Sequence, residues 1–148
     1  MGARAADQGR APSRIALELS VLLDTTVLID LLRGRPRTVE RLMVLRRHGS
    51  VPFTTTINVE EIHRGLRPSE HDAAARLLDG LRLAPLGRSE GARAGDWRRE
   101  HASAGVTLAQ ADCLIAAAAV STGVPLATGN PKHFPMSELS VEHWPVGE

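Results

Sequence analysis

Side chains able to bind a metal lie at the ends of apolar runs in this sequence. Asp24 closes the apolar run 17–23, and Glu61 follows the β-branched run 51–57 within about one helical turn. Asn130 follows a third run, 124–128. In open parallel α/β sheets, ligands bind beyond the carboxyl ends of the strands. These three positions are therefore candidates for one functional site.

Asp112 belongs to the same group of candidates, although it lies early in an apolar, alanine-rich segment. A buried and unpaired carboxylate is costly, so Asp112 must lie at an exposed helix edge or have a partner. Carboxylates that converge repel one another unless a hard divalent cation such as Mg²⁺ or Mn²⁺ joins them. Such a cation lowers the pKa of bound water and offsets charge on phosphoryl oxygens. The pattern therefore favours phosphodiester hydrolysis.

The elements that must position these residues alternate between strands and helices. Strands are expected over residues 17–23, 51–57, 124–128 and 139–144, with 83–86 either a strand or a connector. Helices are expected from Asp24 to residue 32, over 38–47, over 59–66 with Asn58 as its cap, from Ser69 to 81, over 88–101 and over 108–121. This alternation predicts an α/β domain with a mainly parallel sheet.

Composition limits the remaining classes. The chain has 148 residues, of which 43% are hydrophobic, which suits a single domain with a real core. A net charge of +1 and 3% aromatic residues indicate neither bulk electrostatic RNA binding nor stacking platforms. The single Cys113 excludes a disulfide framework and a cysteine-based zinc cluster. We expect a cytoplasmic protein without membrane segments, with a flexible extension over 1–16 and one domain over 17–148.

Four segments, taken in order, resemble the signature segments of VapC-type PIN-domain toxins. They are residues 22–34 (LLDTTVLIDLLRG), 58–66 (NVEEIHRGL), 111–119 (ADCLIAAAA) and 126–134 (LATGNPKHF), and the resemblance extends over about 21–144. It implies a three-layer α/β/α sandwich around a mainly parallel sheet of four to five strands. It also implies a Mg²⁺- or Mn²⁺-dependent endoribonuclease acting on tRNA, rRNA or mRNA and leaving 3′-hydroxyl and 5′-phosphate ends. The implied partners are a cognate VapB-like antitoxin, a second copy of the chain and a larger toxin–antitoxin assembly.

The resemblance assigns roles residue by residue. Asp24, Glu61 and Asp112 match the family's metal-binding acids. Glu61 is chosen over Glu60 because the pattern is Glu, an apolar residue, two variable residues and Gly. The chain departs at the fourth acid, where it has Asn130 or His133, so one metal or two remain open.

Four further residues are expected near the substrate. Asn130 keeps a carbonyl oxygen and is expected to act in catalysis. Thr128 is expected to orient water or contact the substrate. Arg64 and Arg67 are the expected RNA contacts, close in sequence to the predicted site.

Each candidate also has a purely structural interpretation. Asp24 is alternatively a helix cap, Asp30 a structural or dimer-facing residue, and Glu60 a solvated helix residue. His63 and His133 either bind metal or transfer protons, or are surface residues, and the surface position is favoured. Cys113 is expected as a small core residue. The arginines between 33 and 47 form either a solvated helix face or a phosphate-binding surface.

Three other functions are compatible with parts of this sequence pattern. A haloacid-dehalogenase type of phosphatase needs a second Asp two residues after the first, where this chain has Thr26. It also needs a downstream lysine, and the sequence offers no convincing one. A housekeeping RNA-processing PIN nuclease shares the acid pattern, but such enzymes are usually larger. A degenerate PIN domain that binds RNA or protein without cutting is supported only by the departure at the fourth acid.

Overall fold

The computed structural model describes residues 11–148 and contains one five-stranded sheet in the order β3-β2-β1-β4-β5. Its strands are β1 (Leu22–Leu23), β2 (Phe53–Thr54), β3 (Arg82–Leu83), β4 (Leu126–Thr128) and β5 (Val141–His143). All four pairings are parallel. The expected parallel sheet is therefore confirmed, and β1 lies at its centre.

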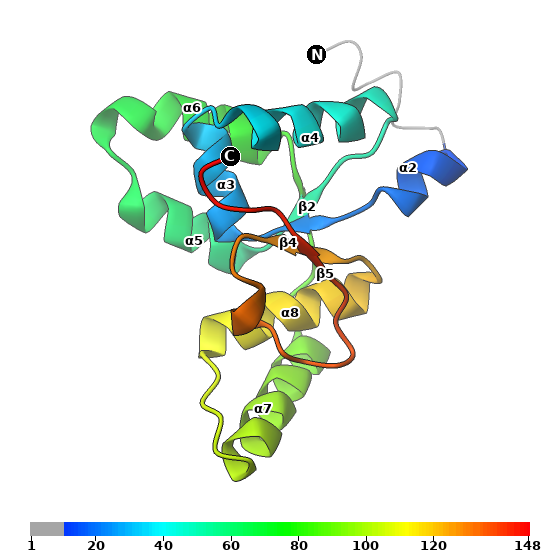
Figure 1. Ribbon diagram of the computed structural model, residues 1–148, viewed down its shortest axis with the longest axis vertical. Helices are drawn as coiled ribbons and strands as arrows, with labels where there is room; N and C mark the ends of the chain where they lie inside the picture. Colours follow the sequence, from blue (N-terminus) through cyan, green and yellow to red (C-terminus); the bar gives the residue numbers. More distant parts are fainter. Residues whose placement is uncertain (1–10) are drawn as a thin grey trace.

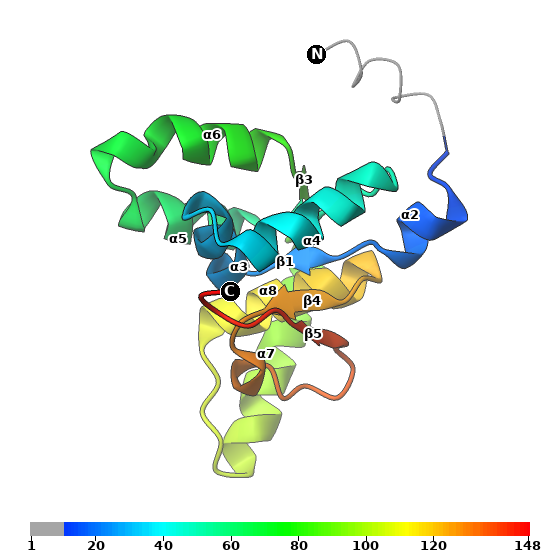
Figure 2. The ribbon, with the colours of Figure 1, turned by 45° about the horizontal axis from the view of Figure 1, so that its top comes forward.

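Helices cover both faces of this sheet (Figures 1 and 2). They are α2 (Arg14–Glu18), α3 (Thr25–Leu32), α4 (Pro36–Arg47), α5 (Thr56–Gly65), α6 (His71–Asp79), α7 (Arg88–Ser103) and α8 (Gln110–Thr122), with short 3₁₀ turns η1 (Pro68–Glu70) and η2 (Pro131–His133). In both views, α3, α4, α5 and α6 lie on one side of the sheet, and α7 and α8 lie on the other. The fold is the expected three-layer sandwich.

The alternation of side chains along β1 builds two separate cores. Leu22 packs with α7 and α8 in one core, while Val21 and Leu23 pack with α3 and α5 in the other. Successive residues of a strand point to opposite faces, so one apolar run of three residues serves both layers. β4 does the same, with Leu126 in the first core and Ala127 in the second.

Helix α8 is the most deeply buried helix, as its composition predicts. Four consecutive alanines, 116–119, are fully buried against the sheet and α7. The helix ends at Gly123, whose φ of 77° is the left-handed conformation typical of a helix C-terminus.

The structure corrects two expectations about element boundaries. The run 17–23 does not begin as a strand, because Ser13 caps helix α2 by accepting a hydrogen bond from the Ala16 backbone N–H, and α2 crosses the expected boundary at residue 17. The rest of the expected extension, residues 1–10, lies outside the described part. Asn58 does not cap the next helix: Thr55 is the cap, and Asn58 is the third residue inside α5.

The run 51–57 is likewise only partly a strand, because α5 begins at Thr56. Ser69 lies in η1 rather than opening α6, which starts at His71. None of the helices between residues 11 and 148 is long and apolar enough to cross a membrane.

Candidate metal centre

Asp24 lies between the end of β1 and the first residue of α3, in the N-cap position. Asp24 is thus the N-cap residue, as the structural interpretation expects, but its side chain makes no capping hydrogen bond. Instead, Asp24 Oδ2 accepts a 2.8 Å hydrogen bond from the Thr128 hydroxyl, and Oδ1 accepts a 3.4 Å bond from Asn58 Nδ2. Asp24 is 6% exposed, and its carboxylate is held by the last residue of β4 and by Asn58 of α5, the helix after β2.

The environment of Asp24 works against its negative charge. Burial raises the pKa of Asp24 above its ordinary value, and the nearby carboxylate of Glu61 raises it further. The hydrogen bond from Thr128 opposes both effects, because it stabilises the ionised form. A bound cation would relieve the same strain on the carboxylate.

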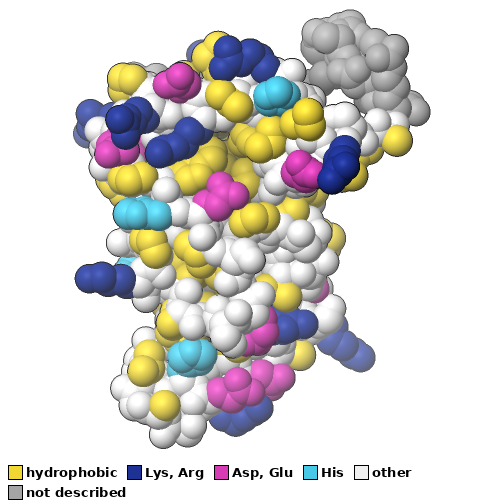
Figure 3. All heavy atoms as spheres, turned by 45° about the vertical axis from the view of Figure 1, so that its right-hand side comes forward, with side chains coloured by type: hydrophobic (Ala, Val, Ile, Leu, Met, Phe, Trp, Pro, Cys, Tyr) yellow, Lys and Arg dark blue, Asp and Glu magenta, His cyan; other side chains and the backbone are white. Residues whose placement is uncertain are grey.

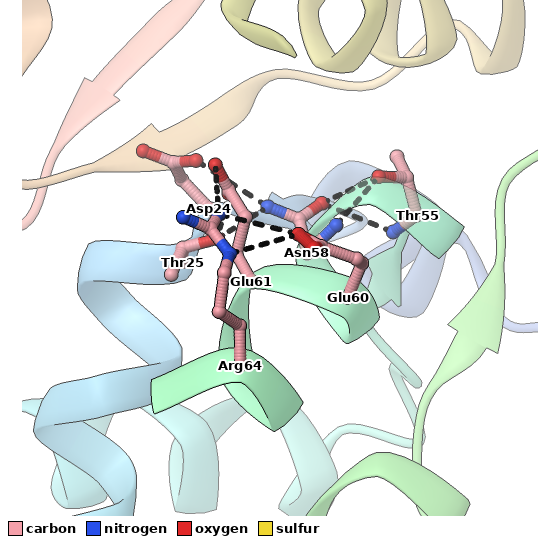
Figure 4. A network of polar contacts seen from close by, with 7 residues as sticks. All are labelled: Asp24, Thr25, Thr55, Asn58, Glu60, Glu61 and Arg64. Carbon is pink, nitrogen blue, oxygen red and sulfur yellow. Dashed lines mark hydrogen bonds and ion pairs between the residues drawn. The ribbon is translucent and has the colours of Figure 1, made fainter. Parts of the chain in front are cut away.

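Glu61 joins Asp24 through a short chain of polar side chains, which Figure 4 shows. Thr25 Oγ1 donates a 2.6 Å hydrogen bond to Glu61 Oε1, and Asn58 Nδ2 donates a 3.0 Å bond to Thr25 Oγ1. Asn58 is fully buried, and its Oδ1 accepts from the hydroxyl of Thr55 at 2.7 Å. One amide therefore fixes both carboxylates relative to each other.

Asp112 approaches from the first turn of α8 and is half-buried. Burial raises the pKa of Asp112, and the charges of Asp24 and Glu61 raise it further, whereas His133 lowers it. His133 Nδ1 lies 3.6 Å from Asp112 Oδ2. Asp112 thus has a partner at a partly exposed helix edge, as expected from its position in the sequence.

The three carboxylates line an open site. Among residues 11–148, no three acidic, histidine or cysteine side chains stand close enough together to form a ready-made metal cluster. Their mutual electrostatic effects nevertheless place Asp24, Glu61 and Asp112 within range of one another. This oxygen donor set fits a hard divalent cation that keeps several of its own water ligands.

The segment after β4 forms the floor of the site. Thr128 is fully buried, which argues against the expected contact with substrate and assigns its hydroxyl to Asp24. The Asn130 backbone N–H donates to Thr128 Oγ1 at 3.0 Å, and its side chain is exposed. The Gly129 backbone N–H donates to Thr26 Oγ1 at 2.9 Å, and a Cβ at this position would overlap the side chain of Val146.

The expected RNA contacts are exposed near Glu61. Arg64 forms an ion pair with Glu60 at 3.2 Å and lies 4.0 Å from Glu61 Oε2 (Figure 4). Arg67 is exposed, two residues beyond the end of α5. Glu60 is therefore the solvated residue that the sequence indicates, and His63 is also exposed.

Other candidates have structural roles. Asp30 is buried and accepts a 2.9 Å hydrogen bond from the Gly147 backbone N–H, so it holds the C-terminal segment. Cys113 is a buried core residue, and burial raises the pKa of its thiol.

Three arginines of α4 are exposed: Arg37, Arg46 and Arg47. Figure 3 shows several positive side chains at the upper end of the molecule, where α4 and α6 lie.

Three contributors to the site are not predicted by the sequence. The sequence indicates Thr25 only as a neighbour of Asp24, indicates Asn58 as a cap, and favours a surface position for His133 over metal binding or proton transfer. Thr25 and Asn58 carry a weak signal, since both are small polar residues within three positions of a predicted ligand. His133 is 56% exposed, yet its ring faces Asp112.

Two hollows on the surface differ in their relation to this site. A hollow of about 340 Å³ lies along α7 and is lined by Ser89, Ala92, Arg93, Asp96, Trp97, Glu100 and Glu138. A smaller hollow of about 70 Å³ lies between α3 and α5 and includes Glu61. Only the smaller of the two adjoins the carboxylates.

These features define an α/β/α protein with an acidic, oxygen-lined site at the carboxyl edge of a parallel sheet. The chain belongs to the PIN-domain family, whose model matches residues 21–136. That span contains all three carboxylates and His133.

Relatives of known name agree with this assignment. The chain is 34% identical to ribonuclease VapC10 of Mycobacterium tuberculosis over 118 residues, which cover 80% of this chain and 88% of the relative. It is 30% identical to ribonuclease VapC19 of the same organism, over 78% of this chain and 92% of the relative. Its fold is similar to VapBC2 from Rickettsia felis, solved with a promoter DNA fragment, with a TM-score of 0.76, 20% identity, and coverage of 84% of this chain and 98% of that one.

Proposed function

We propose that this chain is a metal-dependent endoribonuclease and the toxin component of a type II toxin–antitoxin pair. The observation that carries the proposal is the buried carboxylate of Asp24, held by Thr128 and Asn58 and facing the charges of Glu61 and Asp112. The relatives VapC10 and VapC19, which bear the name ribonuclease, support an activity on RNA.

The chain's own side chains fit the binding of Mg²⁺ or Mn²⁺. Asp24, Glu61 and Asp112 would hold the ion, because their carboxylates repel one another without it. Bound there, it would lower the pKa of a water molecule and offset charge on the phosphoryl oxygens.

The neighbouring residues keep these ligands oriented for hydrolysis. Thr128 and Asn58 donate to the two oxygens of Asp24, and Thr25 donates to Glu61 Oε1. Each of these carboxylate oxygens has a second lone pair that it can offer to the ion. Asn130 and Arg64 border the site at exposed positions and are proposed to contact the RNA backbone. We propose that this activity takes place in the cytoplasm.

A cognate antitoxin is the proposed partner. Several solved structures with this fold are described as toxin–antitoxin complexes. The hollow between α3 and α5 offers apolar side chains from Ile29, Leu32, Ile62 and Leu66 beside Glu61. An apolar antitoxin segment in that hollow would lie directly beside the carboxylates and block the RNA.

The direct test is cleavage of a structured RNA pool by the purified chain with Mg²⁺, Mn²⁺ or EDTA. We expect metal-dependent cutting that disappears in Asp24→Asn and in Asp112→Asn, while Asp96→Asn, on the exposed face of α7, keeps it. A folded wild type that cuts no RNA with either metal would instead favour a degenerate binding domain.

A second test concerns the partner. The product of a small reading frame next to the gene, encoding a DNA-binding antitoxin, should form a stable complex with the chain and abolish cleavage. Uninhibited cleavage in the presence of such a product, or the lack of such a neighbour, would favour a housekeeping nuclease.

A further inference from the structure

The site has two ends with different donor atoms. At one end, Asp24 and Glu61 are tied together by the hydroxyl of Thr25 and the amide of Asn58. At the other end, Asp112 faces the imidazole of His133. His133 therefore adds a nitrogen donor to a set of carboxylate oxygens.

The distance between Asp112 and His133 is too long for a good hydrogen bond between them, but it is suitable for two side chains that bind the same ion. The 3.6 Å between Nδ1 and Oδ2 is beyond the usual range of a hydrogen bond. Two donors that each lie about 2.1 Å from one cation are separated by roughly 3.0 to 3.4 Å when they occupy adjacent positions. A movement of a few tenths of an ångström would bring both side chains onto a shared ion.

The backbone keeps His133 in this place although its ring is solvent-accessible. The His133 N–H donates to the Asn130 carbonyl at 3.1 Å, and the next residue, Phe134, is buried in the core. The Asn130 N–H in turn donates to Thr128, the residue that holds Asp24. The turn η2 is thus anchored to the same threonine as the opposite end of the site.

The two donors differ in the cations they prefer. Carboxylate oxygens suit Mg²⁺ and Mn²⁺ alike, whereas imidazole suits transition metals and is a poor ligand for Mg²⁺. We propose that Asp112 and His133 form a mixed carboxylate–imidazole ligand pair that makes this site select Mn²⁺ over Mg²⁺. This inference rests on the proposed metal-dependent function and specifies its ion.

The test measures metal binding without RNA. The electron paramagnetic resonance signal of free Mn²⁺ disappears on binding, so titration of the full chain gives the Mn²⁺ affinity, and competition with Mg²⁺ gives the Mg²⁺ affinity. We expect His133→Ala to weaken Mn²⁺ binding by about tenfold and to change Mg²⁺ binding by less than about twofold. His133→Asp should retain binding while reducing the preference for Mn²⁺.

Matched variants separate a ligand from a structural residue. His63→Ala removes an exposed histidine from α5 and should leave both affinities unchanged. His133→Gln keeps the size of the side chain and should show the same selective loss as His133→Ala, with an unfolding temperature equal to that of the wild type.

Equal losses for both ions, or an unchanged Mn²⁺ affinity in the His133 variants, would overturn the inference. The Mn²⁺ affinity would be unchanged in the His133 variants if His133 were only a surface residue or a phosphate contact. Because RNA is absent from the titration, the outcome is independent of cleavage. A wild type that binds Mn²⁺ through His133 but cuts no RNA would defeat the proposed function and leave this inference standing.

Discussion

Thr128 and Asp24 are 104 positions apart in the sequence, yet the Thr128 hydroxyl donates a 2.8 Å hydrogen bond to Asp24 Oδ2. Strand pairing makes this contact, because Leu23 lies opposite Ala127 in the parallel pair β1–β4. Asp24, the residue after β1, therefore lies beside Thr128, the last residue of β4, at the carboxyl edge of the sheet. The geometry of the acidic site depends on this register.

Removing the Thr128 hydroxyl should weaken the site. In Thr128→Val, Asp24 loses a hydrogen bond that favours its ionised form, so the pKa of Asp24 should rise further and metal binding should require a higher pH. The free energy of unfolding, measured in urea, should fall by about 1 to 3 kcal/mol, because Asp24 Oδ2 and the Asn130 N–H lose their hydrogen-bond partner. Thr128→Ser keeps the hydroxyl and should behave as the wild type; a Val variant with an unshifted pH profile of Mn²⁺ binding would contradict the role assigned to Thr128.

In the metal-free protein, the contribution of Asp24 and Asp112 to stability should fall as the pH rises from about 4 towards neutrality. The folded-state pKa values of Asp24 and Asp112 are both raised above the ordinary value of 3.8. The folded chain then holds protons that the unfolded chain releases. The resulting stabilisation is present below pH 3.8 and is lost as the pH rises through the folded-state values.

Thermal unfolding in EDTA across this pH range measures the effect. Asp24→Asn carries no charge at this position. The unfolding temperature of this variant should therefore rise relative to that of the wild type as the pH increases. Asp96→Asn, at an exposed position of α7, should follow the wild type. Parallel curves for the wild type and Asp24→Asn would contradict the raised pKa of Asp24.

Asn58→Asp should impair cleavage more than its small change in shape suggests. The variant loses the N–H groups that contact Asp24 and Thr25 and adds a negative charge beside them. Displaced reacting groups cost about 100-fold in rate, and we expect a loss of that order in kcat for RNA cleavage. Ser103→Asp adds one negative charge at an exposed position of α7, removes none of these bonds and should cost far less; equal losses in Asn58→Asp and Ser103→Asp would count against the bridging role of Asn58.

Gly129→Ala should destabilise the floor of the site by about 1 to 3 kcal/mol. A Cβ there would overlap Val146 Cγ2 and lie 3.3 Å from the carbonyl oxygen of Trp144. Val146 is 59% exposed, so Val146→Ala alone should cost less than about 0.5 kcal/mol. Urea unfolding of the double variant should recover part of the loss, whereas strict additivity of the two changes would rule out the overlap with Val146.

The layers of the fold and the acids of the site follow from patterns that the sequence displays directly. The apolar runs around residues 21–23 and 126–127 predict buried strands, and a parallel arrangement brings their ends together. Asp24 and Asp112 then fall at this edge because their neighbours in the sequence are the most strongly apolar segments. The pattern of neighbouring residues is enough to predict the positions of these two acids.

The other features of the site depend on contacts between segments that are distant in the sequence, and sequence patterns do not predict such contacts. Asn58 satisfies the local rule for a cap, but Thr55 takes that role, and the Asn58 amide turns towards Asp24. His133 looks like an isolated surface histidine until η2 is placed beside α8. The strand expected over 17–23 begins as a helix because Ser13, outside the apolar run, caps it.

The central place of β1 and β4 in the sheet also has a consequence for synthesis on the ribosome. β1 leaves the ribosome early, but its neighbour β4 follows about a hundred residues later, as the pairing of Leu22 with Leu126 shows. Pairing between distant segments forms late in folding. A growing chain therefore carries Asp24 and Glu61 without Thr128 to fix the first of them, so the proposed metal site is completed only when translation has nearly finished.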